Sequence, residues 1–246
     1  MKFSSLFQVT SLISLFQATQ AQAGIEWIIS KTPSTGLKDI TFPISLQNAP
    51  HEQGWFFAQQ FKFNGRYQRI NDVGYAGLQP LKDSGSSPVI RAVFASFIDG
   101  TTTNDKNCAE LVDGRQGISC SVDIKATYSN KQLIQIHNTD GTTWVATLID
   151  SVTKARSPIG SWKLPDGAEG IQGSEIGFAE YYPLSNGDHK TCSQIPKTEV
   201  VFGNPYNFQD GLMGIVSRPY QIGECYGTSN FQTVKTDDGY KITDGF

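Results

Sequence analysis

The chain has 246 residues, of which 17% are charged and 24 are glycine, and its formal net charge is -3. This charge balance argues against a nucleic-acid partner, because a phosphate backbone is bound mainly through clustered Lys and Arg. It argues equally against a polybasic membrane-surface site. Abundant glycine with few charged residues favours short strands joined by tight turns over helices.

The N-terminus predicts a secretory signal peptide over residues 1–23. Lys2 supplies a positive charge, residues 3–16 are the apolar stretch, and Ala21 and Ala23 offer small side chains to a signal peptidase, so we expect the cut before Gly24. A membrane anchor is the alternative, but the stretch is interrupted by polar residues and is shorter than the ~20 apolar residues that a span requires. We therefore expect a secreted, extracellular protein with no membrane insertion.

Residues 24–246 are expected to form a single β domain, with an irregular tail from about residue 203 in which only short strands at 214–218 and 240–243 are predicted. Strands are predicted over residues 40–46, 54–63, 73–80, 89–98, 118–128, 131–137, 143–150, 157–164 and 175–182. They recur with Gly, Asn, Asp or Pro between them, which is typical of an all-β chain folded as a two-sheet antiparallel β-sandwich or jelly roll. A closed barrel is the alternative.

Some strand pairings are suggested by the sequence itself. The strand at 89–98 is apolar on both faces apart from Arg91 and Ser96, and we expect it to pair with 54–63. Residues 118–128 and 131–137 resemble a hairpin, and Asp140-Gly141 predicts a second hairpin between 131–137 and 143–150.

The four cysteines predict two disulfides, because the export signal sends them to an oxidising compartment. Three pairings are possible. We favour Cys108 with Cys120 and Cys192 with Cys225, since each closes a local loop. A zinc site is the alternative, but no C-x-x-C motif or histidine pair supports it.

Catalytic constellations are sparse. No G-x-S-x-G motif accompanies the three histidines, His51, His137 and His189, so a serine hydrolase is not indicated. A glycoside hydrolase needs two carboxylates on one face, and Glu175 and Glu180 are five positions apart in one strand, which sends them to opposite faces. We expect Glu180 to have a partner such as Arg91.

Sugar binding without catalysis requires only exposed aromatic rings beside polar side chains. The candidate ligand-binding residues are Trp162, Tyr75, Tyr181, Trp144 and Glu180. Trp162 lies among glycine and proline residues, so we expect it to be exposed. No cofactor is indicated and no metal-binding residue is assigned, although loop acids leave calcium open.

Several strings resemble a family of secreted microbial proteins known only as a domain of unknown function. They are residues 55–63 (WFFAQQFKF), 74–79 (GYAGLQ), 93–97 (VFASF), 117–120 (GISC) and 144–150 (WVATLID). The resemblance covers residues 40–203 and implies an exported bacterial or fungal β-sandwich. It brings no established activity or catalytic residue.

The leading hypothesis from these patterns is an extracellular, non-enzymatic recognition protein that binds polysaccharide or a cell-surface glycan. The alternative is a secreted fungal effector or virulence protein that binds or inhibits a host extracellular protein, such as a protease. A glycoside hydrolase-like enzyme ranks third, with Glu180 and Asp150 as the residues to mutate.

Overall fold

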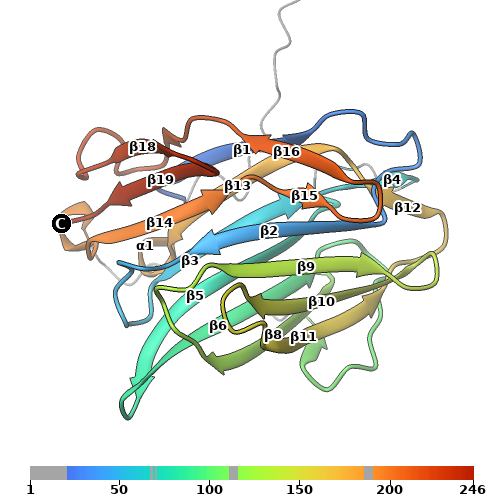
Figure 1. Cartoon of the computed structure of the whole chain (residues 1–246), viewed down its shortest axis with the longest axis horizontal. Helices are drawn as coiled ribbons and strands as arrows, with labels where there is room; N and C mark the ends of the chain where they lie inside the picture. Colours follow the sequence, from blue (N-terminus) through green and yellow to red (C-terminus); the bar gives the residue numbers. More distant parts are fainter. Residues whose placement is uncertain (1–20, 67–68, 70, 111–115, 186–190) are drawn as a thin grey trace, which may run out of the picture.

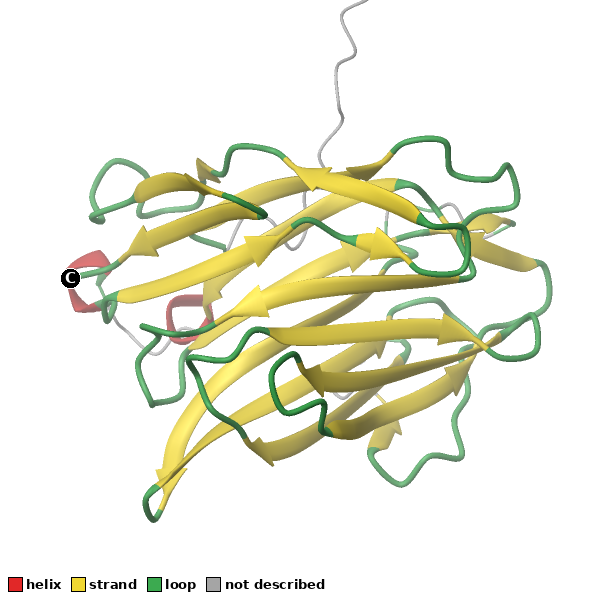
Figure 2. Ribbon diagram, in the orientation of Figure 1, coloured by secondary structure: helices red, strands yellow, loops and turns green. Residues whose placement is uncertain are grey.

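The structure is a computed structural model that describes residues 21–66, 69, 71–110, 116–185 and 191–246. Strands make up 56% of the chain and helices 3%. The strands pair in antiparallel fashion into a large, nearly closed sheet (Figures 1 and 2). The prediction of an antiparallel all-β chain is therefore confirmed.

Two runs of strands make up this sheet. The first run joins, in spatial order, β16 (Leu212–Val216), β1 (Ala23–Ile29), β13 (Ser174–Tyr181), β3 (Trp55–Phe61), β5 (Gly74–Ser84), β6 (Ser87–Ser96), β8 (Ile118–Lys125) and β7 (Cys108–Glu110). The second run joins β11 (Arg156–Lys163), β10 (Thr143–Asp150), β9 (Gln132–Asn138), β2 (Asp39–Ser45), β14 (Thr198–Gly203), β19 (Gly239–Asp244) and β18 (Gln232–Thr236).

Short elements connect and flank these runs. They are β15 (Tyr206–Asn207), β17 (Tyr220–Gln221), the pair β4 (Phe63–Gly65) and β12 (Ala168–Ile171), the helix α1 (Tyr182–Ser185) and a 3-10 turn at Cys192–Gln194. β15 pairs with β2 of the second run and with β16 of the first, so the two runs are continuous through hydrogen bonds at this side.

The core lies between the two runs and is built by period-two burial. Each strand sends alternate side chains inward, and both runs contribute large rings that are almost fully buried. From the first run these rings are Trp27, Trp55, Phe57, Phe61 and Phe94, and from the second run they are Phe42, Trp144, Trp162 and Phe202.

Two predicted pairings are wrong and one is confirmed. β3 pairs with β13 and β5, not with β6, and β8 pairs with β6 and β7, not with β9. The reason is that β8 and β9 belong to different runs, so the turn between them carries the chain from one run to the other. The hairpin of β9 and β10 is confirmed. After residue 203 the chain still contributes five strands, which makes the tail more regular than predicted.

Both predicted disulfides, Cys108 with Cys120 and Cys192 with Cys225, are confirmed. The first lies between β7 and β8 and is covered by Gly160 of β11. A Cβ atom at Gly160 would come within 2.6 Å of the Cys108 sulfur, so only glycine lets β11 of the second run approach the disulfide of the first.

The described chain starts inside the predicted signal peptide. Ala21 and Gln22 are 0% and 1% exposed, and the Gln22 backbone N–H donates to the Ala179 carbonyl at 2.9 Å. The Gln22 side-chain oxygen also accepts a hydrogen bond from the backbone N–H of Tyr181. A cut before Gly24 would remove these bonds. Residues 1–20 of the predicted signal peptide lie outside the described residues. Within the described part, no helix is long and apolar enough to cross a bilayer.

We predict that a chain beginning at Gln22 is more stable than one beginning at Gly24. The shorter chain loses at least three hydrogen bonds, since the Ile222 N–H also donates to the Gln22 carbonyl at 3.0 Å, and each contributes about 0.5–1.5 kcal/mol. A loss of about 1 kcal/mol lowers Tm by roughly 2–4 °C in a chain of this size. Thermal unfolding of both chains measures the difference, and a chain beginning at Ala21 is the control. Equal Tm values for the chains starting at Gln22 and Gly24 would contradict the prediction.

Candidate functional site

A second apolar cluster lies on the side of the first run that faces away from the core, which we call the outer face. Its buried members are Ala21, Phe56, Ala58, Val93 and Phe178, and Tyr75, Tyr182 and Ile222 pack against them. The same alternation that sends Trp55 and Phe57 into the core sends Phe56 and Ala58 to this face. Strand β3 is therefore apolar on both sides.

The rings of the outer face are in mutual contact. The centroid of Phe56 is 5.6 Å from that of Phe178 and 5.5 Å from that of Tyr75, both in edge-to-face geometry. Tyr75 also contacts Phe97, with centroids 5.2 Å apart. Such pairs favour each other beyond simple area burial, so the outer face has a well-ordered aromatic centre.

A row of polar side chains crosses the strands beside this centre. Glu180 of β13 is opposite Phe56 of β3, Gln79 of β5 is opposite Arg91 of β6, and Arg91 is opposite Asp123 of β8. Phe56 in turn faces Gln79, one position beyond the last registered pair, Phe57 with Leu78. We call Glu180, Gln79, Arg91 and Asp123 the polar row.

Arg91 is fixed by two hydrogen bonds to the Asp123 carboxylate, from Nε at 2.7 Å and from the terminal nitrogen at 3.0 Å. The hydrogen bond with Asp123 raises the pKa of Arg91 above its ordinary value, against the opposing effect of burial. Burial raises the pKa of Tyr182 above its ordinary value, and the nearby positive charge of Arg91 opposes this rise. Arg91 thus holds its charge at the margin of the aromatic centre.

The two ends of the outer face differ in character. At the β1 and β16 end, Ile28 is opposite Ile215, and these side chains are 46% and 60% exposed. At the β6 and β8 end, a groove of about 540 Å³ is lined by five charged residues, Lys82, Asp83, Arg91, Asp123 and Lys125, with Leu81 and Val89 as its apolar lining. One face therefore combines an exposed aliphatic end, an aromatic centre and a charged end.

Three of the five candidate residues are not on this face. Trp162 and Trp144 are 1% and 0% exposed, and Tyr181 is 2% exposed. Trp162 stacks on Phe94 with centroids 4.4 Å apart, so the prediction that it is exposed is wrong. The reason is alternation: Trp162 is opposite Trp144 in register, and both point to the core.

The other two candidates, Tyr75 and Glu180, do lie on the outer face, and both are partly exposed. Arg91 forms its ion pair with Asp123, and a partner such as Arg91 for Glu180 stays a prediction. Glu175 faces the opposite way from Glu180, as predicted, and forms an ion pair with Lys62 at 3.5 Å.

The carboxylates do not form a glycosidase pair. The Cα atoms of Asp123 and Glu180 are four strand spacings apart, about 19 Å. Glu26 lies on the strand next to Glu180 but four residues farther along, so their Cα atoms are about 13 Å apart. Both exceed the ~5–9.5 Å that sugar hydrolysis requires. Asp150 accepts hydrogen bonds from the Asn130 side chain and from the backbone of Val152 and Thr153, which gives it a structural role in a turn.

No group of three metal-ligating side chains converges in the described part of the chain. Calcium stays an untested prediction. His189 lies outside the described residues.

Sequence reasoning missed Phe56, Phe178, Gln79 and Asp123 as members of one site. The available signal was the double-sided apolar pattern of residues 54–63, which marks a strand with something on each face. The pairing of β3 with β13 and β5 is what turns that pattern into a shared surface.

No family model and no curated protein matches the sequence. The chain is similar to two solved structures of scytalido-glutamic peptidase, bound to a transition state analog inhibitor and to a peptide based transition state analog, at 13% and 12% identity and a TM-score of 0.46 for both. It is also similar to SCP-B, a member of the Eqolisin family of peptidases, in complex with the tripeptide Ala-Ile-His, at 11% identity and a TM-score of 0.43. Each alignment covers 92% of this chain and 98% of the other.

Glycan recognition, the leading hypothesis from the sequence, is therefore corrected. Three of the four rings proposed to stack on sugars, Trp162, Trp144 and Tyr181, are core residues that are at most 2% exposed.

We predict that Trp162→Ala destabilises the fold by about 3–5 kcal/mol, because it opens a cavity in the core. Trp162→Phe is the matched control. It should cost much less, since the indole N–H has no hydrogen-bond partner among the described residues and its removal leaves no group unpaired. Urea unfolding of both variants measures the free energies. An Ala variant as stable as the native chain would show that Trp162 is not a core residue.

Proposed function

We propose that this chain is an extracellular protein that binds an extended segment of another polypeptide on its outer face. The observation that carries this proposal is the pair of exposed aliphatic side chains Ile28 and Ile215, 46% and 60% exposed, at one end of a face whose opposite end is charged. Exposed apolar side chains grouped on one face, beside polar ones, are typical of protein-binding surfaces.

The two ends of the outer face support a polypeptide ligand in particular. Exposed Ile28 and Ile215 suit aliphatic side chains, whereas Arg91 and Asp123 suit charged ones. A polypeptide presents both kinds of side chain on one strand. Ile28 of β1 lies five strand spacings from Asp123 of β8 and about six residues away along the strand direction, roughly 31 Å in all, so an extended segment of about twelve residues, roughly 40 Å long, reaches both ends.

The scaffold and compartment belong to the same proposal. We infer that the two runs are the facing layers of a β-sandwich closed at one side by β15 and β16. Two disulfides support an oxidising, extracellular setting. The proposal is a more specific form of the effector hypothesis, in which the partner is a host extracellular protein.

The test is binding of random peptides, displayed on an array, to the native chain and to variants of the exposed end. We expect Ile28→Asp and Ile215→Asp each to weaken binding about tenfold or more, since a buried aliphatic contact contributes about 1.5–3 kcal/mol. Both side chains are about half exposed, so the Tm should hardly change.

Val234→Asp is the matched control. Val234 is 53% exposed on β18, in the second run and away from the outer face. Its variant should bind as the native chain does. Absence of any bound peptide, or equal weakening by Val234→Asp, would refute the proposal.

A second candidate function, peptide hydrolysis, is favoured by the composition of the polar row. A general base and nearby donors for a developing oxyanion are the requirements for hydrolysis. Glu180 could take a proton from water and Gln79 could donate to the oxyanion, whereas Arg91 is held by Asp123. Phe56 lies between Glu180 and Gln79, which keeps this candidate behind simple binding.

Mass spectrometry of bound peptides separates the two candidates. If the chain hydrolyses peptides, Glu180→Gln should lower the cleavage rate about a hundredfold or more and should retain binding, because the glutamine side chain keeps the shape of glutamate but is not a base. For binding alone, peptides are recovered intact from the native chain. Cleavage that persists in Glu180→Gln would remove Glu180 from any catalytic role.

A further inference from the structure

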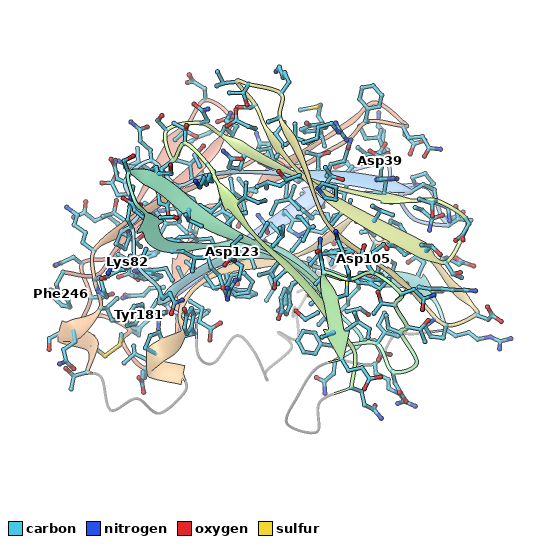
Figure 3. The ribbon with its side chains drawn as sticks, turned by 90° about the horizontal axis from the view of Figure 1, so that it is seen from below. Asp39, Lys82, Asp105, Asp123, Tyr181 and Phe246 are labelled. Atoms are coloured by element: carbon cyan, nitrogen blue, oxygen red, sulfur yellow. A yellow bond between two sulfur atoms is a disulfide. The ribbon has the colours of Figure 1, made fainter. Side chains whose placement is uncertain are left out.

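The charged groove at the β6 and β8 end of the outer face has an unequal distribution of charge. It contains three cations, Lys82, Arg91 and Lys125, and two carboxylates, Asp83 and Asp123 (Figure 3 labels Lys82 and Asp123). The chain as a whole has a net charge of -3, so this groove is positive within an acidic molecule.

Both carboxylates of the groove already have partners. Asp123 accepts two hydrogen bonds from Arg91, and Asp83 lies 2.7 Å from the His51 ring nitrogen. Among the described residues, neither Lys82 nor Lys125 forms an ion pair, and both are exposed. Two ammonium groups are therefore available to an incoming anion.

The groove is large enough to hold a side chain of a bound polypeptide, which a flat surface would not do. Its volume is about 540 Å³, and it continues the polar row past Arg91 along β5, β6 and β8. The apolar side chains of Leu81 and Val89 form part of its wall, which can cover the methylene groups of an entering side chain.

We propose that this groove takes acidic side chains, Asp or Glu, of the polypeptide bound on the outer face. The inference rests on the proposed function and names its ligand class: an extended segment with carboxylates at one end and aliphatic residues at the other. Charge complementarity of this kind selects among partners more than it adds affinity.

The test compares two amidated peptides of about twelve residues that carry aliphatic residues at one end and either glutamate or glutamine at the other. We expect the native chain to bind the glutamate peptide about 3- to 10-fold more tightly, as one or two exposed ion pairs would give. The preference should fall as salt rises from 0.05 to about 0.5 M, because exposed charges are screened.

A double variant, Lys82→Gln with Lys125→Gln, should bind both peptides equally. The matched control is Lys106→Gln with Lys235→Gln, which changes the net charge by the same amount at exposed positions outside the groove. This control should keep the full preference, and loss of the preference in it would overturn the assignment to the groove.

Other outcomes separate this inference from the proposed function. Equal binding of both peptides by the native chain overturns the acidic preference and leaves polypeptide binding intact. Absence of binding by either peptide overturns both. A glutamine peptide with a free C-terminus that binds as tightly as the glutamate peptide would assign the groove to chain ends and overturn the side-chain assignment.

Discussion

The placement of β3 between β13 and β5 is the constraint on which the rest of this structure depends. The pairing brings Phe56 between Glu180 and Gln79, and Ala58 between Phe178 and Gly77. On the other side of the same backbone, Trp55, Phe57 and Phe61 enter the core. One strand thus supplies both the stability of the fold and the centre of its candidate binding surface.

This arrangement sets different demands on the two faces of the first run. The inner face packs against the second run, where close approach is possible because Gly160 leaves room for the disulfide of Cys108 and Cys120. The outer face has no second run against it, yet it still carries a cluster of aromatic rings. Phe56 and Phe178 are already largely out of water, at 6% exposure each, so the apolar area that a bound partner would remove from water is that of the exposed Ile28 and Ile215.

The character of the outer face favours recognition over catalysis. Its centre is aromatic, and its ionisable groups lie along one margin, where Arg91 is committed to Asp123. A catalytic site would place acid, base and oxyanion donors within hydrogen-bond reach of one reacting atom. Glu180 and Gln79 are separated by Phe56, whereas the exposed aliphatic and cationic ends are free to contact a long ligand at many points.

The sequence by itself determined the alternation of burial and most strand positions, because these depend on local periodicity. It left three disulfide pairings open, and the favoured one is the one that forms. It could not decide which strands become neighbours. The turn after β8 crosses to the other run instead of closing a hairpin, and β3 pairs with β13, more than a hundred residues away. Those long-range pairings buried Trp144, Trp162 and Tyr181 and left Tyr75 and Glu180 on the outer face. Burial of a given ring depends on which sheet covers it, and that is a property of the assembled tertiary structure.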